Sequence, residues 1–180
     1  MKSLIIFSHP KPEKSLANKT ILTALSGAAE VRTLIELYPE YRIDVRAEQE
    51  ALLKADLIIL QFPFYWYSVP AILKLWFDEV FEYGFAYGSS GDKLKGKKLL
   101  LSFTTGGPKE AYSKEGYNHY EIEELLTPLI QTANLAGMTF LPPLYTHSMV
   151  YIPGHREKEE IEVRALEHAK KVIALLNSEQ

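Results

Sequence analysis

The sequence predicts an α/β domain with a parallel five-stranded sheet, in the doubly wound order 2-1-3-4-5, and helices on both faces. The first reason is that short apolar runs alternate along the chain with segments whose apolar residues recur at helical spacing. The second is that these runs are nearly continuous, as in strands that are buried on both faces. Strands and helices that alternate in this way form right-handed crossovers between parallel strands.

Five apolar runs predict the strands, at residues 3–8, 30–37, 56–62, 97–104 and 139–144. Polar residues interrupt the second run, which suits an edge of the sheet, and Pro142-Pro143 breaks the fifth. Helices are expected at residues 15–27, 48–55, 121–136 and 157–177, and a further helix from Pro70 onward. Ser15 is a preferred residue for a helix N-cap, and Pro128 either kinks its helix or starts the second half.

The composition fits one globular domain that spans residues 1–180, without repeats or a linker. The chain has no cysteine, which excludes a disulfide framework, a cysteine-based zinc or iron–sulfur site and a thiol nucleophile, and we expect no metal site. The net charge of −3 provides no basic field for nucleic acid or an anionic membrane. No apolar run reaches the ~20 residues of a membrane span, and the start does not resemble a signal peptide, so we expect a cytoplasmic protein.

The chemically suggestive residues follow the first, third and fourth predicted strands, at residues 9–18, 63–70 and 104–117. In an open doubly wound sheet, ligands bind beyond the carboxyl ends of the strands, where the strand order reverses. In the order 2-1-3-4-5 this point lies between the first and third strands. We therefore expect the three loops to surround one crevice.

The first loop precedes a helix N-terminus, where free N–H groups and the helix dipole favour a phosphate. Ser15 and Asn18 can add donors, and His9 can face the same anion. The alternative is that Ser15 only caps the helix and that His9 only ends a strand. Neither the Gly-x-Gly-x-x-Gly turn nor the Walker lysine pattern is present, which disfavours a Rossmann dehydrogenase and a P-loop NTPase.

Aromatic residues are concentrated in one region, since 11 of the 21 lie between Phe62 and Tyr87. Rings of the loop at residues 62–67 suit stacking on a planar cofactor or contact with a partner subunit. The stripe of Trp76, Phe77 and Phe81 is assigned to the core instead. Residues 104–107 (TTGG) can offer backbone N–H groups to the edge of a flat ring, or form a plain turn. Tyr112 and His119 are candidate proton donors, although either residue alone also suits packing or the surface.

Four segments together indicate a family: Ser8-His9-Pro10, residues 61–74 (QFPFYWYSVPAILK), residues 85–88 (FAYG) and residues 104–107 (TTGG). In order and spacing they resemble the flavodoxin-like NAD(P)H:quinone oxidoreductase family. The relatives include short bacterial members and ancillary subunits of glutathione-gated potassium-efflux systems. The resemblance covers residues 3 to about 140, and its long block at residues 61–74 is far more specific than a short glycine motif.

The resemblance implies a flavodoxin-like fold and a set of flavin-binding residues. It implies that the phosphate-bearing tail is held by His9, Ser15, Leu16 and Asn18. It implies that the ring packs against Pro63, Phe64, Tyr65, Trp66 and Tyr67, and that its pyrimidine edge is covered by Thr104, Thr105, Gly106 and Gly107. Tyr112 matches the tyrosine that lies beside the hydride-transfer site in the family. The partner histidine of the family falls at Asn118 by strict count, one residue before His119, so that role stays open between the two.

The resemblance also implies an activity, in which NAD(P)H reduces a noncovalent flavin that then passes two electrons to a quinone, with ping-pong kinetics. FMN is expected, with FAD as the alternative. A homodimer is expected as well, because rings at Tyr65, Trp66, Tyr67, Tyr83, Phe85 and Tyr87 remain for an interface.

Two further functions are considered. One is a regulatory ancillary subunit that docks peripherally on a potassium-efflux transporter, with incidental reductase activity. The other, a one-electron carrier, is disfavoured because such carriers are strongly acidic and −3 is mild. The sequence leaves open the physiological acceptor and the choice between NADH and NADPH.

Overall fold

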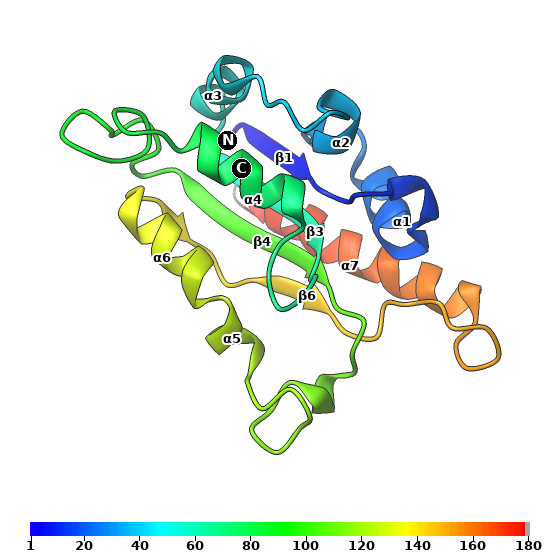
Figure 1. Ribbon diagram of the computed structural model, residues 1–180. Coiled ribbons are helices and arrows are strands. Elements are labelled where there is room, and N and C mark those ends of the chain that lie inside the picture. The colour runs from blue at the N-terminus through cyan, green and yellow to red at the C-terminus, as the bar shows by residue number, and fades with distance from the viewer. Residues whose placement is uncertain (179–180) are drawn as a thin grey trace.

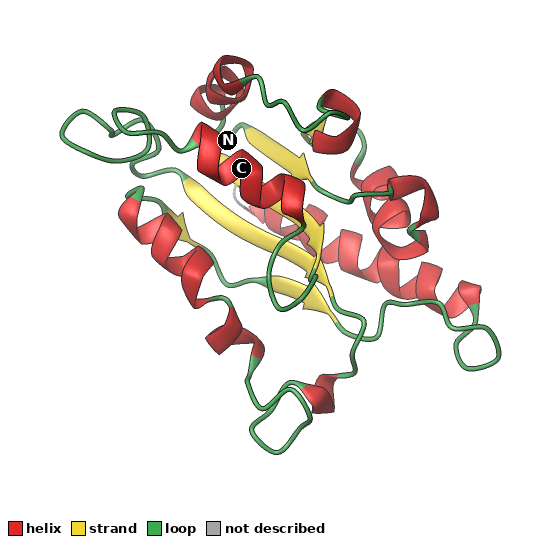
Figure 2. Ribbon diagram, in the orientation of Figure 1, coloured by secondary structure: helices red, strands yellow, loops and turns green. Residues whose placement is uncertain are grey.

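A computed structural model describes residues 1–178 and confirms the predicted architecture, with helices on both sides of one sheet (Figure 1; Figure 2). The strands lie in the order β2-β1-β3-β4-β5, and a short additional strand, β6, pairs with β4. Their bounds are β1 Ser3–Phe7, β2 Glu30–Thr33, β3 Leu57–Pro63, β4 Lys98–Thr104, β5 Thr139–Phe140 and β6 Leu144–Thr146. All pairings between these strands are parallel. The order places the reversal between β1 and β3, as predicted.

Two predicted strands differ from the structure. The second run was expected to be extended through residue 37, but Leu34–Leu37 form the short helix α2. Its neighbour β1 ends at Phe7, which is paired with Thr33, so no ladder partner remains beyond that residue. The fifth run is divided in two, because Pro142 and Pro143 lack the N–H groups that a ladder needs. The chain then resumes as β6, which pairs with the second half of β4.

The other helices are α1 Leu16–Leu25, α3 Val45–Lys54, α4 Ala71–Val80, α5 Ile122–Leu125, α6 Thr127–Leu135 and α7 Lys158–Ser178, with 3₁₀ turns η1 Pro12–Lys14 and η2 Lys109–Ala111. Ser15 caps α1, because its side chain accepts a hydrogen bond from the N–H of Asn18. Pro128 stands in the first turn of α6 and so starts a separate helix. Within residues 1–178, no helix is both long and apolar enough to cross a membrane.

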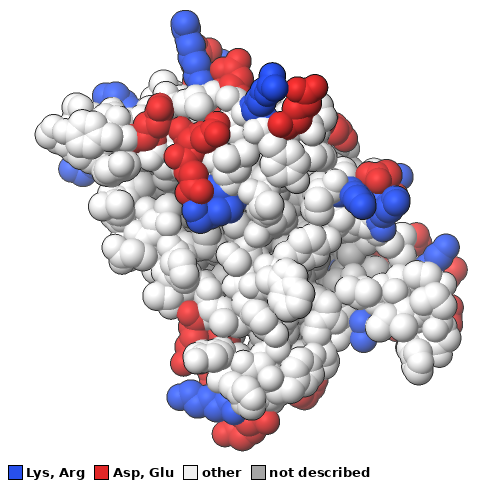
Figure 3. Space-filling view, viewed as in Figure 1, with Lys and Arg blue, Asp and Glu red and all other residues white. Residues whose placement is uncertain are grey.

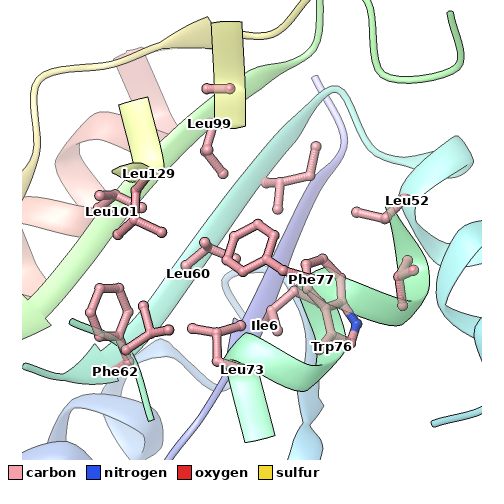
Figure 4. Packing of buried hydrophobic residues seen from close by; sticks show 14 of the residues in the cluster. Ile6, Leu52, Leu60, Phe62, Leu73, Trp76, Phe77, Leu99, Leu101 and Leu129 are labelled. Atoms are coloured by element: carbon pink, nitrogen blue, oxygen red, sulfur yellow. The ribbon is translucent and has the colours of Figure 1, made fainter. Parts of the chain in front are cut away.

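The alternating side chains of the strands supply two cores, one on each face of the sheet. On one face Ile6, Leu60 and Leu101 pack with α3, α4 and α6, and Figure 4 shows Trp76 and Phe77 of α4 in this layer. On the other face α1 and α7 cover the sheet around a second cluster. Its strand residues are Ile5, Leu57, Ile59 and Leu100. The assignment of Trp76, Phe77 and Phe81 to the core is confirmed, although Phe81 is only partly buried.

A buried carboxylate joins α3 to the edge strand and to α4. Glu48 is fully buried, and its Oε1 accepts hydrogen bonds from Arg32 Nη2 at 2.6 Å and from the Tyr38 hydroxyl at 2.6 Å. Its Oε2 accepts from Trp76 Nε1 at 2.8 Å. Burial and the bond to Glu48 raise the pKa of Tyr38 to about 12, so that hydroxyl stays a donor. A charge in this position is stable because each oxygen has a donor.

We expect Glu48→Ala to lower the free energy of unfolding by about 3–5 kcal/mol, because Arg32, Tyr38 and Trp76 would each lose an acceptor. Urea unfolding followed by tryptophan fluorescence measures this effect. Glu50→Ala is the matched control, since Glu50 forms an exposed ion pair with Arg46 on the same helix and contributes little. Equal effects of the two substitutions would contradict the account of the buried carboxylate.

Candidate functional site

The three predicted loops meet at one edge of the sheet. Strands β1, β3 and β4 are neighbours and end at Phe7, Pro63 and Thr104. The starts of the loops are held to adjacent strands, since Ser8 N donates to Gln61 O and Phe64 N donates to Thr104 O. The sheet therefore fixes the positions at which the loops begin.

The start of α1 borders a cavity of about 760 Å³. Its lining includes His9, Ser15, Leu16 and Ala17. Tyr65 also lines it and belongs to the loop at residues 64–70, which we call the aromatic loop. The lysines at positions 11, 14, 19 and 158 also line it, and Glu13 and Glu162 are the acidic members. Free N–H groups of the first helical turn, the positive end of the helix dipole and four ammonium groups favour an anion in this cavity.

His9 is held at the entrance of this cavity. Its Nδ1 accepts a hydrogen bond from Lys11 N at 3.0 Å, so in the neutral ring the proton is on Nε2, which lies 3.4 Å from the Tyr65 hydroxyl. Burial lowers the pKa of His9, and Glu13 opposes the shift. The neutral ring therefore offers one N–H donor at physiological pH. Tyr65, which was expected at the ring of the cofactor, lies at the anion cavity instead.

A second, smaller pocket of about 230 Å³ lies between the aromatic loop and the segment that follows β4. It is lined by Phe64, Trp66, Tyr67, Gly106, Gly107, Tyr112, Tyr117 and Asn118. The N–H groups of Gly106 and Gly107 donate no hydrogen bond within the described residues 1–178, so both are available to a ligand. A Cβ on Gly107 would lie 3.0 Å from the Tyr117 hydroxyl, so the absence of a side chain keeps this wall open. We call this the ring pocket.

The aromatic loop is a tight turn in which Trp66 and Tyr67 have positive φ angles of 48° and 61°. The turn is closed by two hydrogen bonds between Tyr65 and Ser68. Positive φ costs a non-glycine residue about 1–3 kcal/mol, and such strain is concentrated at functional sites. The turn leaves the Trp66 side chain 91% exposed.

The segment after β4 places Asn118 rather than His119 at the ring pocket. Asn118 Oδ1 accepts a hydrogen bond from the Tyr67 hydroxyl at 3.0 Å. His119 has a positive φ of 61°, is exposed and does not line the pocket. The fold of this segment requires glycine at position 116, where a Cβ would lie 2.3 Å from the Glu110 carbonyl oxygen. The position of Asn118 at the pocket therefore favours Asn118, which the strict count of residues gives, over His119 for the role of the family's partner histidine.

Tyr112 lines the ring pocket, and its neighbour is a histidine that the sequence analysis missed. The rings of Tyr112 and His147 lie 5.2 Å apart at an interplanar angle of 34°. His147 Nδ1 is 3.0 Å from the Thr105 hydroxyl. Burial raises the pKa of Tyr112 and lowers that of His147, so both side chains are neutral near pH 7. His147 directly follows β6. Because ligands bind beyond the carboxyl ends of the strands, His147 would have been a candidate if β6 had been predicted.

Four residues with predicted cofactor contacts are buried beneath the site. Asn18, Thr104 and Thr105 are 3%, 4% and 1% exposed, and Pro63 is buried at the end of β3. The Asn18 amide is bonded to Thr104 and Gln61, and the Thr105 hydroxyl lies within hydrogen-bond distance of Gly107 O and His147. These side chains support the two pockets from below, whereas the pockets themselves are lined by their neighbours in sequence.

The residues present suit a flavin mononucleotide. One end of the site attracts an anion, and the other has aromatic walls and two free backbone donors, which matches a phosphate joined by a polar chain to a flat ring. The described residues contain no group of three or more histidine or acidic side chains that would hold a metal ion.

A helix terminus at a cavity rich in lysine, next to an aromatic pocket at the reversal point of a doubly wound sheet, is typical of α/β proteins that bind a nucleotide cofactor. A family model for the flavodoxin-like fold matches residues 1–173, and the chain belongs to this family. The predicted family and fold are thereby confirmed.

Two curated relatives illustrate the sequence similarity. The glutathione-regulated potassium-efflux system ancillary protein KefF of Enterobacter sp. (strain 638) is 49% identical over 146 residues, which cover 80% of this chain and 82% of KefF. General stress protein 14 of Bacillus subtilis (strain 168) is 45% identical over 153 residues, which cover 84% of this chain and 87% of that protein.

Two solved structures are similar in fold and in sequence. The general stress protein 14 of Treponema denticola in complex with FMN has a TM-score of 0.90 and 33% identity, with all of both chains covered. An NADPH-quinone reductase from P. pentosaceus has a TM-score of 0.76 and 31% identity, with 94% of this chain and 98% of that chain covered.

Proposed function

We propose that the protein is an FMN-dependent NAD(P)H:quinone oxidoreductase. The observation that carries this function is the pairing of the anion cavity at α1 with the ring pocket on the same sheet edge. Relatives named as a quinone reductase and as an FMN complex support the same function. FMN is proposed as a noncovalent cofactor, with FAD as the alternative, and NAD(P)H as the co-substrate.

Bound FMN supplies the redox chemistry, in which hydride is taken from NAD(P)H and two electrons are passed to the acceptor. The N–H groups of Gly106 and Gly107 would donate to the ring edge and stabilise negative charge that develops there. The Tyr112 hydroxyl, kept protonated by its raised pKa, would donate to the reacting substrate. Trp66, Tyr67 and Asn118 form the remaining wall, against which NAD(P)H and the quinone would bind in turn.

A homodimer is proposed for the face that carries the aromatic residues. Trp66 is 91% exposed, Tyr83 66% and Leu135 65%, which is a large apolar surface for a monomer. Phe85, which was expected to belong to this surface, is only 8% exposed and packs in the core. Figure 3 shows that charged side chains are sparse over the middle of the face that it displays. Lys74 and Asp78 of α4 form an exposed ion pair.

A second apolar pocket of about 230 Å³ lies on the same face, between α4 and α6. Val69 from the aromatic loop and Tyr87 both line it, so the loop and the segment around Tyr83 form one surface. A twofold partner on this surface would cover the open side of the ring pocket and exclude water from hydride transfer.

A regulatory role is the second candidate, because the relative KefF is named an ancillary protein of a potassium-efflux system. Capture of a potassium-efflux transporter by the tagged protein, together with negligible turnover of quinones, would favour this role. Rapid quinone turnover by the purified protein without any partner favours the reductase.

We expect the protein to bind FMN reversibly. After reconstitution with excess FMN and gel filtration it should be yellow, and mass analysis of the flavin released by acid from the protein as purified, without added flavin, should give FMN rather than FAD. A protein that stays colourless after the same treatment would overturn the proposed function.

We expect Tyr112→Phe to lower kcat by about 10–100-fold, because one positioned donor at the reacting centre is lost. Stopped-flow measurement of flavin reduction by NADPH separates this step from binding. Tyr120→Phe is the matched control, since Tyr120 is 55% exposed and lies outside the ring pocket. Equal rates for Tyr112→Phe and the unaltered protein would remove Tyr112 from the reaction.

The same assay separates Asn118 from His119. We expect Asn118→Ala to slow flavin reduction, because the Tyr67 hydroxyl would lose its acceptor beside the pocket, and His119→Ala to leave the rate unchanged. The opposite result would assign the role to His119.

We expect sedimentation equilibrium at micromolar concentration to give twice the chain mass of 20.5 kDa. Trp66→Ser should weaken the dimer by tenfold or more, on the order of the loss of one aromatic interface residue. Leu53→Ser on α3 is the control, because Leu53 is also exposed (49%) but does not line the apolar pocket. A fully active species of single-chain mass would disprove the dimer.

A further inference from the structure

A row of polar side chains crosses the sheet beneath the candidate site, on the face covered by α1 and α7. The members, taken from β6 to the end of β4, are Thr146, His168, Ser102, Gln61, Asn18 and Thr104. We call this row the buried hydrogen-bond chain. On this face each central strand is apolar in its middle, at Ile59 and Leu100. The next residues on the same face toward the carboxyl ends, Gln61 and Ser102, are polar.

The histidine end of the buried hydrogen-bond chain has a defined direction. The Ser102 hydroxyl donates its only proton to Gln61 Oε1 at 2.6 Å. At the contact of 2.8 Å between Ser102 Oγ and His168 Nε2, the histidine must therefore be the donor. His168 Nδ1 is then the acceptor in the contact of 2.9 Å with the Thr146 hydroxyl.

The other end continues in the same direction. Gln61 Nε2 donates to Asn18 Oδ1 at 3.1 Å, and Asn18 Nδ2 donates to Thr104 Oγ1 at 3.0 Å. Thr104 Oγ1 is thus an acceptor, and within residues 1–178 the Thr104 hydroxyl donates its proton to no other group. Asn18 belongs to the first turn of α1 at the anion cavity, and Thr104 is the last residue of β4 before the glycines of the ring pocket.

The interior around His168 favours its neutral form. The side chain is 1% exposed, and it lies on α7 among the apolar residues Ala165, Ala169 and Val172. Burial, with a smaller contribution from Lys171, lowers the pKa of His168 to about 4. A neutral ring has one donor and one acceptor nitrogen, as the buried hydrogen-bond chain requires.

We propose that His168 is a positioning residue for the FMN site, an inference that rests on the proposed function. As the Nε2–H tautomer it sets the direction of all five hydrogen bonds. The fixed direction ties the first turn of α1, which borders the anion cavity, to the end of β4, which leads into the ring pocket. A buried polar network in which every member has a partner holds those members in one arrangement.

The donor-to-acceptor direction of the buried hydrogen-bond chain depends on His168. Without a donor at Ser102 Oγ, the Ser102 hydroxyl can accept from Gln61, the amides of Gln61 and Asn18 can turn over, and the Thr104 proton is then consumed by Asn18. Both directions become accessible, and the bonds that join α1 to β3 and β4 no longer have one fixed set of donors and acceptors. FMN affinity should then fall by about five- to tenfold, the order expected for one hydrogen bond.

Nuclear magnetic resonance of the ¹⁵N-histidine-labelled protein tests the tautomer directly, without any turnover. We expect the ring nitrogens of His168 at neutral pH to show a protonated Nε2 and an unprotonated Nδ1, both before and after FMN is added. A proton on Nδ1 would reverse the direction of the chain and overturn the proposal.

A double-mutant cycle tests the coupling across the chain. Measured by FMN titration of the flavin-free protein, His168→Leu and Thr104→Val should each weaken binding, and the double variant should be no weaker than Thr104→Val alone. His168→Gln should recover most of the affinity, because its amide can accept from Thr146 and donate to Ser102. Val172→Ala on the same buried face of α7 is the control and should be additive with Thr104→Val.

The outcomes separate the two proposals. Failure of the unaltered protein to bind FMN contradicts the proposed function, whereas normal FMN binding together with unchanged affinity in His168→Leu contradicts the role of His168. Strict additivity of His168→Leu and Thr104→Val would also contradict it. If His168→Leu does not fold, Ser102→Ala interrupts the chain between the same two ends and enters the cycle in its place, with the same expected and contradicting results.

Discussion

Strand β3 is paired along its length with β1 on one side and β4 on the other, and the position of the site depends on this pairing. The pairing aligns Phe7, Gln61 and Ser102 across the sheet, so the three strands end close together and their loops start from one edge. Gln61 reinforces the arrangement, because its backbone oxygen accepts from Ser8 N and its side chain bonds both Ser102 and Asn18. The anion cavity and the ring pocket are therefore built on one frame, and the loops complete it.

The sequence predicts the frame well for a physical reason. Strands buried on both faces are mainly apolar, and Leu57–Pro63 is apolar apart from Gln61, so the central strands and the loops that follow them can be located from composition alone. Short elements at the margins are less predictable. Whether residues after Thr33 stay extended depends on a neighbouring strand that ends at Phe7, which is information from outside the segment.

Side-chain direction is the other property that the sequence does not reveal. Asn18 follows a helix cap and has the chemistry of a phosphate ligand, yet its amide is bonded beneath the site, because α1 presents this residue to β3 and β4. His119 was predicted at the site and lies outside the ring pocket, whereas His147 was not predicted and lies beside Tyr112. The local turn exposes His119, whereas β6 carries His147 to the Tyr112 ring, 35 positions along the chain, a contact that only the assembled sheet creates.

The protonation states of the buried side chains make one end of the site positive and leave the other end uncharged, which is a gradient of charge along the site. Burial lowers the pKa values of His9, His147 and His168 and raises those of Tyr65 and Tyr112, so these five groups are neutral near pH 7. Positive charge remains at the α1 end, from the helix dipole and four lysines, while the ring pocket offers uncharged donors and aromatic faces. A ligand with an anion at one end and a flat, hydrogen-bonding ring at the other has one favourable orientation in such a gradient. In such a ligand the anion would determine the orientation of the ring, and the donors at the ring pocket would stay available for charge that develops during the reaction.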